Sequence, residues 1–232
     1  MKFDVIAFDA DDTLWHNEII YDRGRQMFQN FFESILSPQE TDQALSSIEI
    51  YNIRHYGYGI KSYALSMIEA ALELGGDRLQ TKQIQEILAF AKEIIHAQID
   101  LMKDVEVVLR DLSADFDLML VTKGDLFQQE LKIGRSGLAG YFDFIEVLSE
   151  KTPVDYEKLL GKFGIDPRGF LMVGNSLRSD ILPVIEIGGQ AIHIPYDSTW
   201  THETILERPL GKDEYYQLDS IGQVPQFIRG LN

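Results

Sequence analysis

The feature that most constrains the fold is a short apolar run, Val5 to Phe8, that ends abruptly in acidic residues. Such a run is typical of a strand buried on both faces of a parallel sheet. Open parallel sheets bind ligands beyond the carboxyl ends of their strands, and Asp9 lies at that end. Asp11 follows two residues later, so extended backbone would place both carboxylates on one side. Paired carboxylates at this position suit a hard cation such as Mg²⁺, which commonly binds together with phosphate.

The same stretch has a purely structural alternative. Asp12 or Thr13 could cap a helix that follows an acidic turn, with no ligand involved. The polar residues at the other strand ends must decide between the two interpretations.

Composition narrows the classes of partner. A formal net charge of -16 and a pI near 4.6 argue against nucleic acid, whose binding depends on Lys and Arg neutralising phosphates. No apolar run approaches the ~20 residues of a membrane span, so no membrane partner is expected. The chain has no cysteine, which excludes disulfides and thiolate chemistry and fits a reducing cytoplasm, the location we expect.

Helical periodicity follows the first strand for some eighty residues. Apolar stripes at helical spacing predict a four-helix bundle inserted between the first and second strands. Helices are expected to begin near Ser37 and Thr81. We therefore predict a helical domain at 17–103 and an α/β domain formed by 1–16 together with 104–232.

Two connecting segments have open roles. Residues 55–61 alternate glycines with tyrosines, as in a turn between packed helices or in a loop that faces a substrate. Residues 196–212 show no regular pattern, and no role is predicted for them.

From residue 104 onward strands alternate with helices, which is typical of a parallel α/β sheet of the Rossmann-like class. The predicted strands are Leu118–Val121, Phe142–Leu148, Phe170–Val173, Gln190–Ile194 and Tyr215–Leu218. The predicted helices are Val105–Leu112, Leu126–Ile133, Tyr156–Phe163, Ser179–Ile187 and a short one at the C-terminus. Pro183 is compatible with its helix only near the helix start.

The strand ends carry polar residues that complement one another chemically. Asp9-x-Asp11-x-Thr13, then Thr122, then Lys151, then Gly174-Asn175 with Asp180 resemble the four motifs of the haloacid dehalogenase superfamily. Most members of that family are Mg²⁺-dependent phosphatases. The resemblance extends over the whole chain, and the helical insert matches the family's type 1 cap domain. The stretch from Asp9 to Leu14 also resembles the opening of the family's house-cleaning nucleotidases.

The resemblance assigns catalytic roles to three residues. Asp9 would attack phosphorus and carry an aspartyl-phosphate. Asp11 would protonate the leaving oxygen and then deprotonate water. Lys151 would neutralise developing charge, although alone it could be a surface lysine, just as Thr122 could be a helix cap. Phosphate would be bound by Thr122, Lys123, Gly124 and Lys151. For Lys123, a surface position is the simpler expectation.

The implied cofactor is Mg²⁺, held by Asp9, the Asp11 carbonyl, Asn175 and Asp180. The family usually has Asp at the position of Asn175. A neutral amide oxygen there predicts weaker metal binding without a change of fold.

These observations predict a Mg²⁺-dependent phosphomonoester hydrolase acting on a small cytoplasmic phosphometabolite, such as a nucleotide or sugar phosphate. A phosphomutase of the same superfamily and a non-catalytic Mg²⁺-binding or regulatory member remain as alternatives. Dehalogenation is disfavoured because the dehalogenases lack the second acid, Asp11. The sequence specifies neither the substrate nor the oligomeric state.

Overall fold

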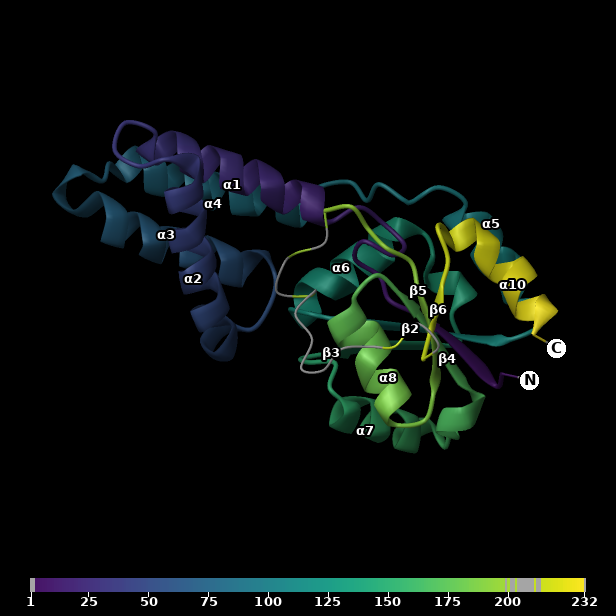
Figure 1. The fold of residues 1–232 in the computed structure, drawn as a ribbon. Helices are drawn as coiled ribbons and strands as arrows, with labels where there is room; N and C mark the ends of the chain where they lie inside the picture. Colours follow the sequence, from purple (N-terminus) through teal and green to yellow (C-terminus); the bar gives the residue numbers. More distant parts are fainter. Residues whose placement is uncertain (1–2, 199, 201–202, 204–210, 212–213, 232) are drawn as a thin grey trace. The chain divides into compact units, whose positions relative to one another are not determined.

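The computed structural model describes residues 3–198, 200, 203, 211 and 214–231 of the 232-residue chain. The chain folds into two compact units, one formed by Met1–Glu18 with Ile99–Asn232 and the other by Ile19–Gln98 (Figure 1). The predicted domain boundaries, 1–16 with 104–232 and 17–103, fall within a few residues of these units. That the helical unit acts as a cap domain stays a prediction.

The first unit contains a six-stranded sheet in the order β3-β2-β1-β4-β5-β6, with every neighbouring pair parallel. The strands are β1 (Val5–Phe8), β2 (Asp117–Lys123), β3 (Phe144–Leu148), β4 (Phe170–Gly174), β5 (Gln190–His193) and β6 (Tyr216–Gln217). In β1, Phe8 is in register with Leu120 of β2 and Val173 of β4. The predicted α/β class with a Rossmann-like parallel sheet is confirmed.

Helices cover both faces of this sheet, which explains the unbroken apolar run of β1. Ile6 and Phe8 point into a core that includes residues of α5 (Val105–Leu112) and α10 (Val224–Gly230). Val5 and Ala7 point into a second core with residues of α7 (Pro153–Phe163) and α8 (Leu182–Glu186). Figure 1 shows α5 and α10 on one side of the sheet and α7 and α8 on the other.

The second unit is built from helices around its own apolar core. Its helices are α1 (Glu18–Phe32, which starts in the first unit), α2 (Pro38–Tyr56), α3 (Ile60–Gly75), the short 3₁₀ helix Gly76–Arg78 and α4 (Thr81–His96). Ser37 and Glu40 form a capping box at the start of α2, and Pro38 occupies its first turn. The predicted helix starts near Ser37 and Thr81 are therefore confirmed. The core packs Phe28, Phe32, Leu45, Tyr63, Met67 and Ile87 together with other apolar residues.

The helix predicted at Ser179–Ile187 is divided into two elements. A π-helical turn, Leu177–Ile181, begins early because the Ser176 hydroxyl accepts a hydrogen bond from the Ser179 amide. Pro183 then lies in the first turn of α8, where a proline is tolerated. The helix at Val105–Leu112 has the predicted bounds, and the other predicted strands and the helices α6 (Leu126–Ser136) and α7 lie within three residues of those observed.

Of the stretch 196–212, residues 199, 201–202, 204–210 and 212 lie outside the described part of the chain. Among the residues that the structure describes, no helix is both long and apolar enough to cross a membrane.

Candidate active site

Polar side chains meet where the parallel strands end. Asp9 directly follows β1, Lys123 ends β2 and Asn175 directly follows β4. Parallel strands have their carboxyl ends at the same edge of the sheet, and the Asp9 amide donates a hydrogen bond to Val173 O of β4 at 2.9 Å. Lys151, which follows β3, reaches the same place.

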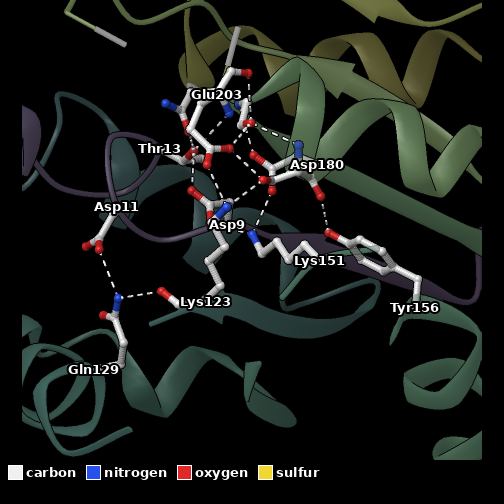
Figure 2. A network of polar contacts seen from close by, with 12 residues as sticks. Asp9, Asp11, Thr13, Lys123, Gln129, Lys151, Tyr156, Asp180 and Glu203 are labelled. Atoms are coloured by element: carbon white, nitrogen blue, oxygen red, sulfur yellow. Dashed lines mark hydrogen bonds and ion pairs between the residues drawn. The ribbon is translucent and has the colours of Figure 1, made fainter. Parts of the chain in front are cut away.

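Lys151 joins two carboxylates at the centre of the site. Its Nζ lies 2.6 Å from Asp9 Oδ1 and 2.6 Å from Asp180 Oδ1 (Figure 2). The side chains of Lys151 and Asp180 are each only 1% exposed. Burial alone would lower the pKa of Lys151, but the charges of Asp180 and Asp9 raise it well above its usual value. The amine is therefore a fixed positive charge, not the solvated surface lysine of the structural alternative.

The π-helical turn fixes Asp180. Its Oδ2 accepts a hydrogen bond from the Ser176 amide at 3.0 Å. A Cβ atom at Gly174 would collide with the Asp180 carboxylate, so this position requires glycine. The hydroxyl of Tyr156, a residue of α7, donates to Ser179 O at 3.1 Å and supports the turn from the other side.

Thr13 links the first and fourth motifs. Its Oγ1 lies 3.0 Å from Asp9 Oδ2 and 3.2 Å from Asn175 Oδ1, and it accepts a hydrogen bond from the Asn175 amide at 3.1 Å. A hydroxyl has one proton, so it can donate fully to only one of these oxygens at a time. The contact nevertheless brings the Asp9 and Asn175 oxygens to the same point.

The oxygen atoms of Asp9, Asn175 and Asp180 fit a magnesium ion in their chemistry. Burial, with the Asp180 charge adding to it and Lys151 opposing it, raises the pKa of Asp9 to about 7. Two carboxylates share one ammonium here, so a cation would relieve the remaining negative charge. Among the described residues no three His, Cys, Asp or Glu side chains form a metal site, and the third side-chain oxygen here belongs to the amide of Asn175.

Asp11 is directed away from this centre. Lys132 Nζ, on α6, lies 2.8 Å from both of its carboxylate oxygens, and Gln129 Nε2 and Trp15 Nε1 donate to them at 2.9 and 2.6 Å. Burial opposes ionisation, but the Lys132 charge and these hydrogen bonds together lower the pKa of Asp11. Figure 2 shows the carboxylate directed toward Gln129 and away from Asp9. No sequence pattern indicated Lys132 or Gln129 as site residues.

Asp12 caps a helix, the role that the sequence left open for Asp12 or Thr13. Its backbone is left-handed, with φ of 61°, and its carboxylate accepts hydrogen bonds from the amides of Asn17 and Glu18 at 2.8 and 3.0 Å. These bonds satisfy donors at the start of α1. Burial raises the pKa of Asp12 to about 6, although both hydrogen bonds oppose the shift. The cap and the Asp9 site therefore coexist in one stretch.

The predicted phosphate-binding residues at the end of β2, Thr122, Lys123 and Gly124, differ from one another in burial and in hydrogen bonding. Thr122 is buried at the end of the strand. Lys123 is not a free surface residue, because its Nζ lies 2.6 Å from Glu203 Oε1 and 2.9 Å from Ser179 Oγ. The Gly124 amide donates to Leu148 O at 3.1 Å, so this N–H is already engaged within the protein.

Glu203 is a site residue that no sequence pattern indicated, because the stretch around it has no regular periodicity. Its carboxylate accepts hydrogen bonds from Ser176 Oγ at 2.7 Å and Ser179 Oγ at 2.5 Å, in addition to the Lys123 ion pair. Burial opposes ionisation, but the Lys123 charge and these hydrogen bonds lower the pKa of Glu203 to about 2. The residue therefore adds a fixed negative charge beside the fourth motif.

The family assignment agrees with this geometry. The model of the haloacid dehalogenase-like hydrolases matches residues 3–188. The chain belongs to this family. Its similarity to a haloacid dehalogenase-like hydrolase of Xanthomonas campestris extends over 99% of this chain and 91% of the other, with 35% identity and a TM-score of 0.87. As a member of this family, the protein is a hydrolase.

More distant relatives also match over their full length. Pyrimidine 5′-nucleotidase YjjG of Escherichia coli K12 is 23% identical over 234 residues, or 98% of this chain and 99% of the relative. The hydrolase YfnB of Bacillus subtilis, in a structure bound to magnesium, shares the fold with a TM-score of 0.69 and 16% identity, over 99% of this chain and all of that one.

Proposed function

We propose that this hydrolase cleaves phosphate monoesters of small cytoplasmic metabolites with the help of Mg²⁺, through a phosphorylated Asp9. The observation that carries the proposal is the buried Asp9 carboxylate, 2.6 Å from the Lys151 ammonium at the carboxyl edge of the sheet. A second carboxylate, Asp11, lies two residues further on. A nucleophile beside a fixed positive charge, with an acid nearby, meets the needs of phosphoryl transfer.

The reaction has two steps. An Asp9 oxygen forms a bond to phosphorus as the bond from phosphorus to the leaving oxygen breaks. Asp11, which Lys132 holds ionised in the free protein, first takes a proton from solvent and then supplies it to that leaving oxygen. Asp11 then accepts a proton from water, whose oxygen attacks phosphorus and releases phosphate from Asp9. General acid-base catalysis of this kind contributes typically ~10²–10⁴ in rate.

The surrounding residues bind and stabilise the transferred group. Lys151 is held by Asp180, so it can neutralise charge on Asp9 and on the phosphoryl oxygens without moving. Thr122, Lys123 and Gly124 form the phosphate loop of the proposal. Because Lys123 is paired with Glu203, its contribution to phosphate binding requires that contact to weaken.

Magnesium would be held by Asp9, the Asp11 carbonyl, Asn175 and Asp180. When bound, it supplies positive charge to the phosphoryl oxygens during transfer. The excess of carboxylate over ammonium at Asp9 and Asp180 supports this assignment.

The relatives suggest which esters to test first. Nucleoside monophosphates head the list because the Escherichia coli relative is named a pyrimidine 5′-nucleotidase. Sugar phosphates follow. A phosphomutase would interconvert phosphorylated isomers without net release of phosphate, and a non-catalytic member would do neither.

The deciding experiment is a phosphate-release screen over nucleoside monophosphates and sugar phosphates, with Mg²⁺ and with EDTA. We expect Mg²⁺-dependent release by the wild type and none by Asp9→Asn. Asp117→Asn is the matched control, because it makes the same chemical change at an exposed position on the opposite edge of the same sheet. Absence of Mg²⁺-dependent release from every ester would contradict the proposed function.

A further inference from the structure

The Asp11 carboxylate is held by a group of three side chains, Trp15, Gln129 and Lys132. Lys132 contacts both carboxylate oxygens, Trp15 Nε1 donates to Oδ1, and Gln129 Nε2 donates to Oδ2. Four donor contacts therefore engage a carboxylate that has four lone-pair positions. In this arrangement Asp11 is fully occupied within the protein.

This arrangement conflicts with the proposed role of Asp11. A general acid must come within hydrogen-bond distance of the leaving oxygen, whereas Figure 2 shows the Asp11 carboxylate directed away from Asp9 and Lys151. The side chain must therefore turn during the reaction.

Two of the three donors can release Asp11 and remain hydrogen-bonded. Lys132 Nζ also donates to Asn17 Oδ1 at 2.7 Å. Gln129 Nε2 also donates to Lys123 O at 2.9 Å. Only the Trp15 indole would lose the acceptor described here, which makes it the natural reporter of where Asp11 lies.

Gln129 connects Asp11 to the phosphate loop. Its amide nitrogen donates both to the Asp11 carboxylate and to the backbone carbonyl of Lys123, and Lys123 directly follows Thr122. A Cβ at Gly124 would lie 3.1 Å from that nitrogen, so the loop and the amide are tightly packed. The buried Oε1 of Gln129 has no hydrogen-bond partner in the described structure. The orientation of the amide is still well defined, because a flipped amide would direct this oxygen at two other acceptors, Asp11 Oδ2 and Lys123 O.

We propose that Lys132 and Gln129 are positioning residues that hold Asp11 turned away from Asp9 and release it when a phosphoryl group binds at Asp9. The inference rests on the proposed function. It goes beyond that function in two ways. Residues of α6 hold the acid Asp11 in its resting position, and binding of a phosphoryl group at the phosphate loop releases it.

Tryptophan NMR tests both parts. The chain has two tryptophans, so a ¹⁵N-labelled sample gives two indole N–H signals, and Trp200→Phe identifies that of Trp15. Mg²⁺ with beryllofluoride mimics a phosphoryl group on Asp9, and ¹⁹F signals report whether it has bound. We expect the Trp15 signal to move upfield on binding, because its hydrogen bond to Asp11 is lost.

Variants of Lys132 test the holding role in the free protein. In Lys132→Met the Trp15 signal should already lie toward its released position and respond little to beryllofluoride, whereas Lys132→Arg should restore the resting position and the response. Lys158→Met, an exposed lysine of α7, is the matched control and should behave as wild type. Gln129→Met is a second route to the same weakening if Lys132→Met does not fold.

The possible outcomes distinguish the positioning role of Lys132 and Gln129 from the proposed phosphatase function. Bound beryllofluoride without movement of the Trp15 signal would overturn release and leave the proposed function standing. An unchanged Trp15 signal in folded Lys132→Met and Gln129→Met would overturn the holding role, whatever the activity. Failure of beryllofluoride to bind would contradict the phospho-Asp9 chemistry, and the release step with it, while the free-protein spectra would still decide the holding role.

Discussion

Two pairs of carboxylate and lysine, one buried and one partly buried, lie beyond the same sheet edge, and the pKa values of their acids are shifted in opposite directions. In the first, Lys151 joins Asp9 and Asp180, and the pKa of Asp9 is raised to about 7. In the second, Lys132 binds Asp11, and the pKa of that carboxyl is lowered. Contact with an ammonium is common to both, so proximity to a lysine does not explain the difference.

The balance of charges and donors does explain it. Asp9 shares its lysine with a second carboxylate, and burial is only partly offset. Asp11 has Lys132 to itself, with Gln129 and Trp15 as additional donors. The first group has an unmet need for positive charge, which suits a site for a cation and phosphate. In the second group the Asp11 carboxylate has its charge balanced and its acceptors occupied, which suits a resting position for that side chain.

The largest difference should appear in turnover. Asp9→Asn replaces the nucleophile with an amide that cannot form the acyl phosphate, so hydrolysis should fall below detection. Steady-state phosphate release with the best ester checks this, and Asp117→Asn serves as the control. A normal rate in Asp9→Asn would refute the mechanism.

Asp11→Asn should slow turnover less, by about 10²–10⁴, because the nucleophile is intact and only proton transfer is lost. With an ester whose leaving group needs little protonation, phosphorylated enzyme should accumulate, since water activation then limits the rate. Acid quench and intact-protein mass spectrometry would detect the added phosphoryl group. Equal losses in Asp9→Asn and Asp11→Asn at every leaving group would remove the division of roles.

The same two substitutions should change the free energy of unfolding in opposite directions. In EDTA at pH 8, Asp9→Asn removes a poorly compensated buried charge and should stabilise the protein by about 1–3 kcal/mol. Asp11→Asn leaves the Lys132 charge without its carboxylate and should destabilise it by about 1–3 kcal/mol. Urea unfolding measures both, and a shift of the same sign in the two variants would contradict the comparison.

The pH dependence in EDTA follows from the same shifts. The folded protein retains a proton on Asp9 that the unfolded chain has lost, so the contribution of this group to stability falls as the pH rises from about 4 to 7. Asp11 contributes stability above about pH 4 and loses it as the pH falls further, because its folded pKa is lowered. Asp9→Asn should therefore remove part of the decline above pH 4, and an unchanged slope would argue against the raised pKa.

A comparable effect on stability should follow from the close packing of Gly124 against Gln129. Gly124 has φ of 140° and a Cβ there would press on the Gln129 amide, so Gly124→Ala should cost about 1–3 kcal/mol and displace Gln129 from Asp11. Gly134→Ala, inside α6 with open space around its Cα, is the control and should be neutral or slightly stabilising. Equal urea midpoints for the two variants would show that the loop is not tightly packed.

Sequence patterns predicted the parts of this molecule that depend on local regularity. The apolar run of β1 requires burial on both faces, and the helix at Val105–Leu112 follows a 3.6-residue period, so both were predicted with their observed bounds. The π-helical turn at Leu177–Ile181 was not predicted, because it depends on one hydrogen bond that the Ser176 hydroxyl accepts from the Ser179 amide.

The candidate site divides in the same way. Asp9, Lys151 and Asp180 were predicted to share the site because they lie at or soon after strand ends and resemble the motifs of the family. Lys132 and Glu203 were not, since a lysine in an amphipathic helix and a glutamate in an irregular segment look like solvated residues. Only their tertiary partners bury them.

The smallest expected effect concerns Asn175, where the chain departs from its family. An amide oxygen lies beside Asp9 where a carboxylate is usual, so an anionic ligand is missing from the proposed metal site. Asn175→Asp should lower the half-saturating Mg²⁺ concentration severalfold, because Mg²⁺ prefers charged oxygen ligands. The new charge would also lie near the Lys151 group and could slow the reaction by drawing that amine from the phosphoryl group. Titration of both proteins with Mg²⁺ separates affinity from maximal rate. Superimposed titrations would show that residue 175 is not a ligand, and metal-dependent activity found only in Asn175→Asp would favour a non-catalytic natural protein.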